Sequence, residues 1–537
     1  MSILIFLVIS YVLLSLSLYL LFPKAGVPAI DGLIPGKNFV QWAKLIGRPA
    51  WWPVLLLIPI VNIFILAGMA VNLVRSFGKY GLGHAAGSVF YTPASFAWLA
   101  KNDTAKYLGP NYTYEKEYLD NVKELRKNKD KRGLEKLMSK SPYRKSVGRE
   151  WIESIFFAVF AAAFIRMFLI EAFVIPTPSM EGSLMVGDFR FVSKASYGIR
   201  TPMTIAMFPL LHNRVPVVGT ESYLKKPSLK YHRLPALEEI GRNKPIVFNW
   251  PVGDSVYITK KRSYTVGQIE RSKGKSFNDK ELNKKVRKKD FVVRPLDKKD
   301  HYIKRCVAVP GDTLQIVNRQ IYINGKPGVN PENMQFLSLF TSPPKQTDRQ
   351  RLMEFGIGDT DSDYYGNEFG KFAGYFLTED QKEKINAVDD NLGLKYKVSP
   401  RGGTQLFPHD EEICKSWSVD NYGPVWIPKK GTTITLTKSN MPFYRRIIDV
   451  YEDNELQVSG DQIMINGKPT TEYTFKQDYY WAMGDNRHNS EDSRSWGYVP
   501  HDHIVGKPLF VWLSLRNAKF GFKNFRFNRM FKSADVN

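Results

Sequence analysis

Residues 302–327 read YIKRCVAVPGDTLQIVNRQIYINGKP, and this stretch decides the fold of the carboxy-terminal part of the chain. Short runs of β-branched and aromatic residues alternate there with Gly, Pro and Asn, a texture typical of strands joined by tight turns. The Asn324-Gly325 pair predicts a two-residue hairpin, and the same pattern returns at 463–469. With further predicted strands at 188–192 and 245–248, we expect a mainly β domain.

Composition narrows the class of protein. The 537 residues carry 76 Lys+Arg against 52 Asp+Glu, a net charge of +24, which indicates anionic partners such as nucleic acid or phospholipid headgroups. Hydrophobic residues make up 43% of the chain, so global disorder is excluded. Two cysteines, Cys306 and Cys414, are too few for a disulfide scaffold or a four-thiolate zinc site.

Three apolar segments precede the predicted β domain. Residues 1–23 contain no charged side chain and are long enough to cross a bilayer; without a positive start they predict a retained anchor rather than a cleaved signal peptide. Residues 51–74 predict a second transmembrane helix. Residues 150–175 predict a third, although Arg166 and two glutamates leave open a buried helix of a soluble domain.

The distribution of basic residues predicts the orientation. The loop 24–50 holds four Lys/Arg, whereas the segment 75–149 holds sixteen. Positive loops stay in the cytoplasm, so the amino terminus is expected inside, 24–50 outside, 75–149 inside, and everything after about residue 175 outside. The anionic bilayer surface is then a better partner for the basic residues than nucleic acid.

The predicted β domain is interrupted. Its first part covers 176–327, with a basic loop at 251–300 that holds fifteen Lys/Arg against seven Asp/Glu. Residues 328–475 are expected to form an inserted mixed second domain, with a helix capped by Thr378, and 476–516 return to the β domain. The tail 517–537 interleaves aromatic and basic residues, which suits a membrane interface; single-stranded nucleic acid or a packed terminal strand are the alternatives.

Lys304 stands out in the quoted stretch. It alternates with Tyr302 and Cys306, so the three side chains share one strand face. If that face is buried, desolvation lowers the pKa of Lys304, and a neutral lysine can take a proton from a serine hydroxyl. A strand-edge lysine that faces water is the alternative.

Ser179 is the candidate nucleophile. Pro176 and Pro178 stiffen the backbone before it, just after the third apolar segment. The Ser179 N–H and the Thr177 hydroxyl could form an oxyanion hole. A proline-rich linker between a helix and a domain is the plainer interpretation of this segment alone.

Three segments, 175–188 (IPTPSMEGSLMVGD), 302–312 (YIKRCVAVPGD) and 484–494 (GDNRHNSEDSR), together resemble bacterial type I signal peptidases. These are membrane-anchored serine proteases with a Ser/Lys dyad that remove signal peptides from exported preproteins. The resemblance implies a cytoplasmic-membrane enzyme whose catalytic domain lies on the periplasmic side, with signal peptides and phospholipids as partners. It implies no cofactor, no metal and no nucleic acid.

The resemblance also implies roles for individual residues. Ser179 is the nucleophile and Lys304 the general base; Thr177 stabilises the oxyanion and Ser490 orients the lysine. Structural support of the site falls to Asp485, Arg487, Asp492 and Arg494. The pockets for alanine-like substrate side chains are lined by Ile175, Met180, Leu184, Tyr302 and Ile303.

Two departures and two alternatives remain. Pro178 stands where many family members have glycine, and Gly182-Ser183 replaces the usual Pro-Thr, but neither change removes a catalytic group. His501 and His503 are predicted to be loop residues rather than metal ligands. The alternatives are a Ser/Lys self-cleaving protease of the SOS-repressor kind, and a catalytically inactive membrane-anchored scaffold or substrate-binding paralogue.

Overall fold

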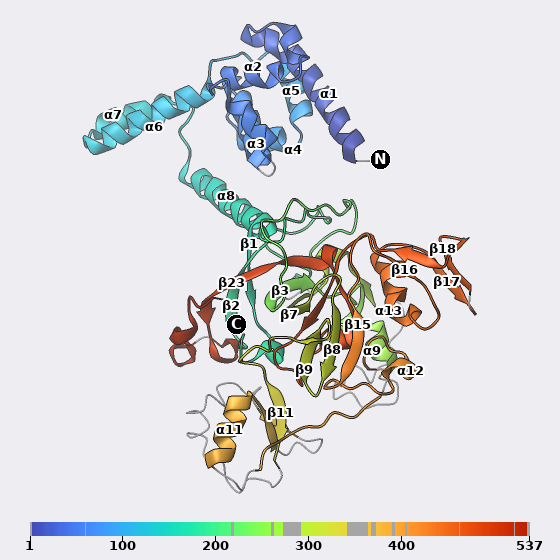
Figure 1. The fold of residues 1–537 in the computed structure, drawn as a ribbon. Coiled ribbons are helices and arrows are strands. Elements are labelled where there is room, and N and C mark those ends of the chain that lie inside the picture. The colour runs from blue at the N-terminus through green and yellow to red at the C-terminus, as the bar shows by residue number, and fades with distance from the viewer. Residues whose placement is uncertain are drawn as a thin grey trace. The chain divides into compact units, whose positions relative to one another are not determined.

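The computed structural model describes residues 3–58, 61–215, 220–258, 263–271, 291–340, 364–366, 372–388, 393–402, 405–460, 462–519 and 521–533. The chain forms two compact units, Met1–Phe156 and Phe157–Asn537, and the boundary falls inside helix α8 (Val147–Phe168). The first unit is helical and the second is rich in strands (Figure 1).

The first unit is built around one apolar cluster. Leu18, Trp42, Leu73 and Phe96 are buried in it and come from four different helices. The α-helices of this unit are α1 (Ile3–Leu21), α2 (Lys37–Leu45), α3 (Val61–Ser76), α4 (Leu82–Phe90), α5 (Thr92–Lys101), α6 (Asn111–Lys127) and α7 (Lys131–Lys140).

Two helices of the described chain, α1 and α8, are long and apolar enough to cross a membrane. The segment 51–74, predicted as one helix, instead holds a 3-10 helix, Trp52–Leu57, and all but the last two residues of α3. α3 has 16 residues. At 1.5 Å per residue it is about 24 Å long, shorter than a hydrocarbon layer of about 30 Å.

The third predicted span also ends earlier than expected. α8 ends at Phe168, and the residues predicted to continue it form strand β1 (Ile170–Val174). β1 pairs antiparallel with β2 (Asp188–Ser193), and Pro176 disfavours helical conformation for the residue before it. Ser179 therefore lies on the connection between two paired strands.

A seven-stranded sheet organises the second unit, in the order β1-β2-β23-β3-β7-β21-β22. Figure 1 labels β1, β2, β23, β3 and β7 of this sheet. All its pairs are antiparallel. The predicted strands at 188–192, 245–248 and 302–309 correspond to β2, β3 and β7. The strands after β2 in this sheet are β3 (Lys244–Asn249), β7 (His301–Ala308), β21 (Tyr479–Met483), β22 (Val499–Pro500) and β23 (Ile504–Ser514).

Both predicted Asn-Gly hairpins are present. One joins β9 (Gln320–Ile323) to β10 (Lys326–Pro327), and the other joins β18 (Gln462–Ile465) to β19 (Lys468–Pro469). The Asn and Gly of both turns have positive φ, as a type I′ turn requires.

The predicted capped helix is α11 (Glu379–Val388). Thr378 Oγ1 accepts from the Gln381 N–H at 3.2 Å, and Gln381 Oε1 accepts from the Thr378 N–H at 3.0 Å. This reciprocal pair is a capping box.

The predicted inserted domain is not confirmed. Residues 157–537 form one unit, and its largest buried cluster joins Leu314 on β8 (Thr313–Val317) to Phe407, Tyr422 and Trp481. Two parts of the predicted basic loop 251–300, residues 259–262 and 272–290, lie outside the described residues. The remaining elements are β4 (Ser255–Ile258), β5 (Ser263–Thr265), α9 (Val266–Arg271), β6 (Val292–Val293), β11 (Phe336–Leu339), β12 (Tyr364–Gly366), β13 (Phe372–Leu377), β14 (Lys395–Tyr396), α12 (Glu411–Cys414), β15 (Tyr422–Trp426), β16 (Thr433–Thr435), α13 (Met441–Arg446), β17 (Leu456–Ser459), β20 (Glu472–Thr474) and α14 (Ser493–Trp496).

Candidate active site

The structure brings the side chains of Ser179 and Lys304 together. Ser179 lies in a 3-10 turn, Pro178–Met180, shortly after β1, and Lys304 lies on β7. Lys304 Nζ is 2.6 Å from Ser179 Oγ and donates a second hydrogen bond to the Ile303 carbonyl at 3.0 Å. Ser179 is 8% exposed and Lys304 only 2%. The contact is therefore largely shielded from water.

Burial lowers the pKa of Lys304 from its ordinary value of 10.5 to about 8, because a buried ammonium loses its hydration. The carboxylates of Asp492, Glu491 and Asp485 oppose this shift. At mildly alkaline pH a large fraction of such a lysine is neutral, and its lone pair can accept the hydroxyl proton of Ser179. The pair can thus activate a nucleophile without a histidine.

Gly484 lets the third motif approach the backbone of Ser179. A Cβ at this position would lie 2.3 Å from the Ser179 carbonyl oxygen and 2.3 Å from Ser490 Oγ. The Asn486 N–H donates to the same Ser179 carbonyl at 3.2 Å. Because only glycine fits here, the residue following β21 and the Ser179 turn meet backbone to backbone.

Asp492 and Arg494 form a buried ion pair. Arg494 donates to Asp492 from Nε at 2.9 Å and from Nη2 at 2.7 Å, and the Gly484 N–H donates to the same carboxylate at 3.1 Å. Burial would raise the pKa of Asp492, but the charge and hydrogen bonds of Arg494 hold it below its ordinary value. The pair ties the motif to the end of β21.

Asp485 pairs with Arg305, a residue to which the sequence assigned no role. Arg305 donates from Nε at 2.8 Å and from Nη2 at 2.7 Å. Arg305 follows Lys304 on β7 and lies opposite Met483 on β21. That register would have identified the pair, but pairing between distant strands cannot be derived from the motif spacing.

Arg487 is also buried. Its N–H donates to the Gln335 carbonyl at 2.9 Å. Burial, assisted by the positive charge of Arg494, lowers the pKa of its guanidinium to about 10. Arg487 therefore lies in the interior of the predicted support loop rather than on its surface.

Ser490 and Thr177 are placed differently from one another. Ser490 lies beside Gly484, but in the described part of the chain its hydroxyl makes no hydrogen bond with Lys304, whose amine points to Ser179 and Ile303. The Thr177 side chain does not cap the turn that carries Ser179, and it lines the adjoining cavity. Thr177 itself is exposed.

The cavity beside Lys304 has a volume of about 470 Å³. Of the predicted pocket residues, Ile175, Tyr302 and Ile303 line it. Met180 and Leu184 instead pack with Ile175 and Ile303 in a buried cluster. The sequence missed lining residues that come from neighbouring strands of the sheet, among them Phe173, Arg190, Val192 and Val247.

The two cysteines and the His501–His503 pair are, by residue type, further candidates for reactive or metal-binding groups. Cys306 and Cys414 are buried and free. Within the described ranges, no group of three or more His, Cys, Asp and Glu side chains is placed to hold a metal ion. His501 and His503 are the first and last residues of a short 3-10 helix.

Two family profiles match the chain. The family described as "Signal peptidase, peptidase S26" matches residues 148–355 and 470–513, which include Ser179, Lys304 and the third motif. A family of unknown function (DUF5684) matches residues 30–110, within the helical unit.

Curated relatives agree with the first profile. Signal peptidase I of Aquifex aeolicus is 46% identical over 368 residues, which cover 68% of this chain and 84% of that protein. Signal peptidase I of Helicobacter pylori (strain 26695) is 23% identical over 380 residues, 68% of this chain and 86% of that protein. The protein of the same name from Buchnera aphidicola (subsp. Schizaphis graminum) is 24% identical over 373 residues, 68% and 76% of the two chains. The chain therefore belongs to the signal peptidase I family and is a serine endopeptidase of peptidase family S26.

Proposed function

We propose that this chain is a membrane-anchored signal peptidase that removes amino-terminal signal peptides from exported preproteins with a Ser179–Lys304 dyad. The match to this chain extends over most of the length of two relatives named signal peptidase I, which supports the substrate class. The observation that carries the proposal is the 2.6 Å contact between Lys304 Nζ and Ser179 Oγ, buried beside a cavity.

In the proposed reaction, neutral Lys304 accepts the hydroxyl proton of Ser179 while Oγ attacks the scissile carbonyl carbon. The Ser179 N–H and the Thr177 hydroxyl stabilise the oxyanion of the tetrahedral intermediate. The Lys304 ammonium then gives its proton to the leaving amine as the C–N bond breaks. Lys304 next takes a proton from water, which hydrolyses the acyl ester and restores Ser179.

The remaining predicted site residues support this pair. Asp485 and Asp492, with their arginine partners, hold the third motif against the Ser179 turn. We propose that Ser490 orients the lysine amine and that Arg487 stiffens the same loop. The apolar set Ile175, Met180, Leu184, Tyr302 and Ile303 would favour small substrate side chains near the cleavage site.

We propose that the catalytic unit lies on the periplasmic side of a bacterial cytoplasmic membrane. The sixteen Lys/Arg of 75–149 favour the cytoplasm for that segment, and α8 would carry the chain across. This placement needs only the basic segment and α8, and it does not depend on whether the shorter α3 also crosses.

Anchoring also suits the substrate and the basic surface. A signal peptide is itself held in the bilayer, so confinement to two dimensions raises its effective concentration at the enzyme. Only Leu169 separates the end of α8 at Phe168 from the start of β1 at Ile170, which would keep Ser179 close to the membrane surface. Phospholipid headgroups would then meet the basic side chains.

Cleavage of a preprotein in detergent tests the dyad. Wild type should yield the mature-size product, whereas Ser179→Ala and Lys304→Ala should each lower kcat/KM by at least about 1,000-fold. Lys395→Ala is the matched control, since Lys395 is an exposed lysine on the short strand β14. Thermal unfolding checks that the inactive variants fold. Full activity of either dyad variant would reject the mechanism, and an inactive wild type would favour a scaffold.

A further inference from the structure

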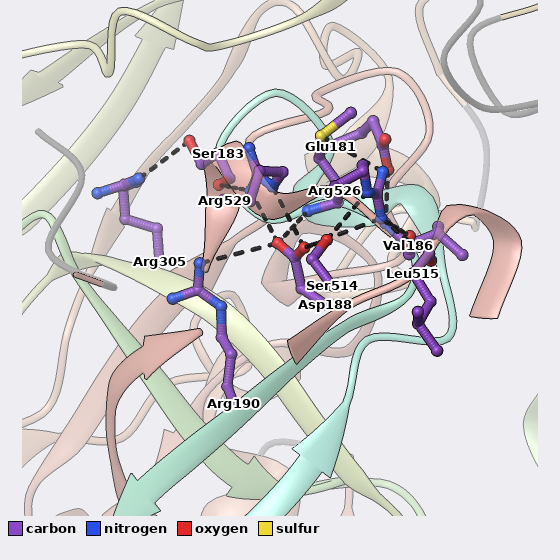
Figure 2. Close-up of polar contacts among 11 residues, drawn as sticks. Glu181, Ser183, Val186, Asp188, Arg190, Arg305, Ser514, Leu515, Arg526 and Arg529 are labelled. Carbon is purple, nitrogen blue, oxygen red and sulfur yellow. Dashed lines mark hydrogen bonds and ion pairs between the residues drawn. The ribbon is translucent and has the colours of Figure 1, made fainter. Parts of the chain in front are cut away.

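The carboxy-terminal segment 521–533 reaches the turn that carries Ser179. Its backbone forms bridges between Leu515 and Phe525 and between Phe510 and Ser533, which fix it beside β23. Figure 2 shows Arg526 and Arg529 of this segment gathered with Ser514 around Asp188. The segment lies beyond residue 513, where the signal peptidase profile ends.

The Ser179 turn, meaning from here on the whole connection 175–188 between β1 and β2, is closed by backbone hydrogen bonds at its two ends and has further ones within it. The Ile175 N–H donates to the Asp188 carbonyl and the Gly187 N–H to the Ile175 carbonyl, both at 2.9 Å. The carbonyl of Met180, next to Ser179, accepts from the N–H groups of residues 183 and 184 at 3.2 and 2.7 Å. A group that holds residues 183–188 therefore also restrains Ser179.

Arg529 makes three hydrogen bonds to this region. Its guanidinium donates to Asp188 from Nη2 at 2.7 Å and from Nε at 3.2 Å. Nη2 also donates to the Ser183 carbonyl at 3.1 Å. This forked contact with a carboxylate fixes direction as well as distance.

Arg526 holds the neighbouring carbonyls. Its Nη2 donates to the Val186 carbonyl and, at 3.3 Å, to the Leu515 carbonyl. Its Nε donates to Ser514 Oγ at 2.9 Å, and that hydroxyl donates to Asp188 at 2.7 Å. Both arginines thus converge on the same side of the turn.

The buried carboxylate of Asp188 depends on the positive charge of Arg529. The Asp188 side chain is fully buried, which would raise its pKa, but the hydrogen bonds and charge of Arg529, with the Ser514 hydroxyl and the Met185 N–H, hold the pKa below its ordinary value. A buried carboxylate that loses its cation is strongly destabilised. If Arg529 were removed, Arg190 Nη2 at 3.9 Å and Arg526 Nη2 at 3.8 Å would remain as weaker partners of Asp188.

The opposite side of the turn is held by the strand that carries the base. Arg305, adjacent to Lys304 on β7, donates to Ser183 Oγ at 3.4 Å and to Asp485 at 2.7 Å. Ser183 therefore accepts hydrogen bonds from Arg305 at its hydroxyl and from Arg529 at its carbonyl. The turn lies between the base-bearing strand and the tail.

We infer that Arg526 and Arg529 are positioning residues, which hold the Ser179 turn at hydrogen-bond distance from Lys304 through Asp188 and the carbonyls of Ser183 and Val186. This inference rests on the proposed Ser179–Lys304 mechanism. Neither arginine touches a reacting atom in the described site, so their loss should lower kcat and leave KM nearly unchanged.

Kinetics of the full chain in detergent, on the same preprotein, test the inference. Arg529→Ala should lower kcat by about 10- to 100-fold with KM changed less than about twofold, because a displaced nucleophile costs rate rather than binding. Arg529→Lys keeps the charge but loses the fork, and should recover part of kcat. Lys523→Ala is the matched control, because it removes the same charge from an exposed position of the same segment and should leave kcat unchanged.

A double-mutant cycle separates positioning from general stabilisation. If Asp188 and Arg529 act as a unit, Asp188→Asn combined with Arg529→Ala should lose no more kcat than the worse single variant. Additive losses, a raised KM, or no recovery in Arg529→Lys would overturn the inference. Thermal unfolding identifies any variant that fails to fold, and Arg529→Lys then carries the test.

The two proposals fail in different ways. An active wild type together with a kcat for Arg529→Ala within about twofold of it would overturn the positioning role alone. A wild type without product, or a fully active Ser179→Ala variant, would overturn the proposed function itself.

Discussion

Two buried clusters of carboxylates and arginines flank the Ser179 turn, and they differ in origin and in exposure. The motif cluster comes from β7 and the third motif, and its members are at most 3% exposed: Arg305, Asp485, Asp492 and Arg494. The tail cluster joins the start of β2 to the end of the chain: Asp188, Ser514, Arg526 and Arg529. The Arg529 side chain is 17% exposed.

The clusters also act on different partners. The carboxylates of Asp492 and Asp485 in the motif cluster raise the pKa of Lys304 against the effect of burial. The tail cluster holds carbonyls and a carboxylate of the turn that carries Ser179. The same kind of ion pair thus shifts the pKa of Lys304 in one place and contacts the turn that carries Ser179 in the other.

Removal of a motif-cluster carboxylate should have the largest effect. Asp492→Ala leaves Arg494 buried without its partner, which should lower the free energy of unfolding by about 3–5 kcal/mol and abolish cleavage. Denaturant unfolding measures the loss. Glu383→Ala, an exposed carboxylate on α11, is the control and should change stability by less than about 0.5 kcal/mol. Unchanged stability in Asp492→Ala would contradict the bracing role.

The pH dependence of kcat should distinguish the clusters. The base must be neutral, so kcat should rise about tenfold per pH unit up to the lowered pKa of Lys304 and then level off. That pKa is about 8. Glu491, next to Asp492 of the motif cluster in the chain, also raises this pKa, so Glu491→Gln should move the rising limb to lower pH. Asp188→Asn should lower kcat without moving the limb. A profile flat down to about pH 5 would rule out a lysine base.

Salt should have the smallest effect and should reach only the tail cluster. At about 1 M salt the Debye length falls to about 3 Å, which weakens contacts near solvent far more than buried ones. Wild-type kcat should therefore fall by no more than about twofold, through the partly exposed Arg529, and Arg529→Ala should show no such loss. A steeper salt dependence in Arg529→Ala than in wild type would contradict this assignment.

Local patterns predicted much of the catalytic unit. The strands at 188–192, 245–248 and 302–309, both Asn-Gly hairpins and the Thr378 cap depend on neighbouring residues, and the structure has them all. The contact between Ser179 and Lys304 could be expected only from the family resemblance, because spacing along the chain does not say which distant residues meet. The Arg305–Asp485 pair needed the register between β7 and β21.

Other expectations are not confirmed, and the reasons are physical. The interleaved aromatic and basic residues of the tail predict a lipid-facing segment, and Phe522 is indeed 84% exposed. The same pattern does not reveal that the Arg526 side chain faces inward, where it is only 4% exposed. The segment 328–475 looked independent because its sequence interrupts the motifs, yet Phe407 and Tyr422 complete the central core. The span predicted at 51–74 is divided, and α3 is short for a bilayer.

Cys306 lies two positions after Lys304 on β7, fully buried, and burial raises the pKa of its thiol well above the ordinary value. The thiolate is the form that oxidises or forms mixed disulfides, so the Cys306 thiol should have low reactivity. The interior that strips water from the amine thus also protects a thiol. In the proposed periplasmic location, this thiol should therefore resist disulfide formation under oxidising conditions.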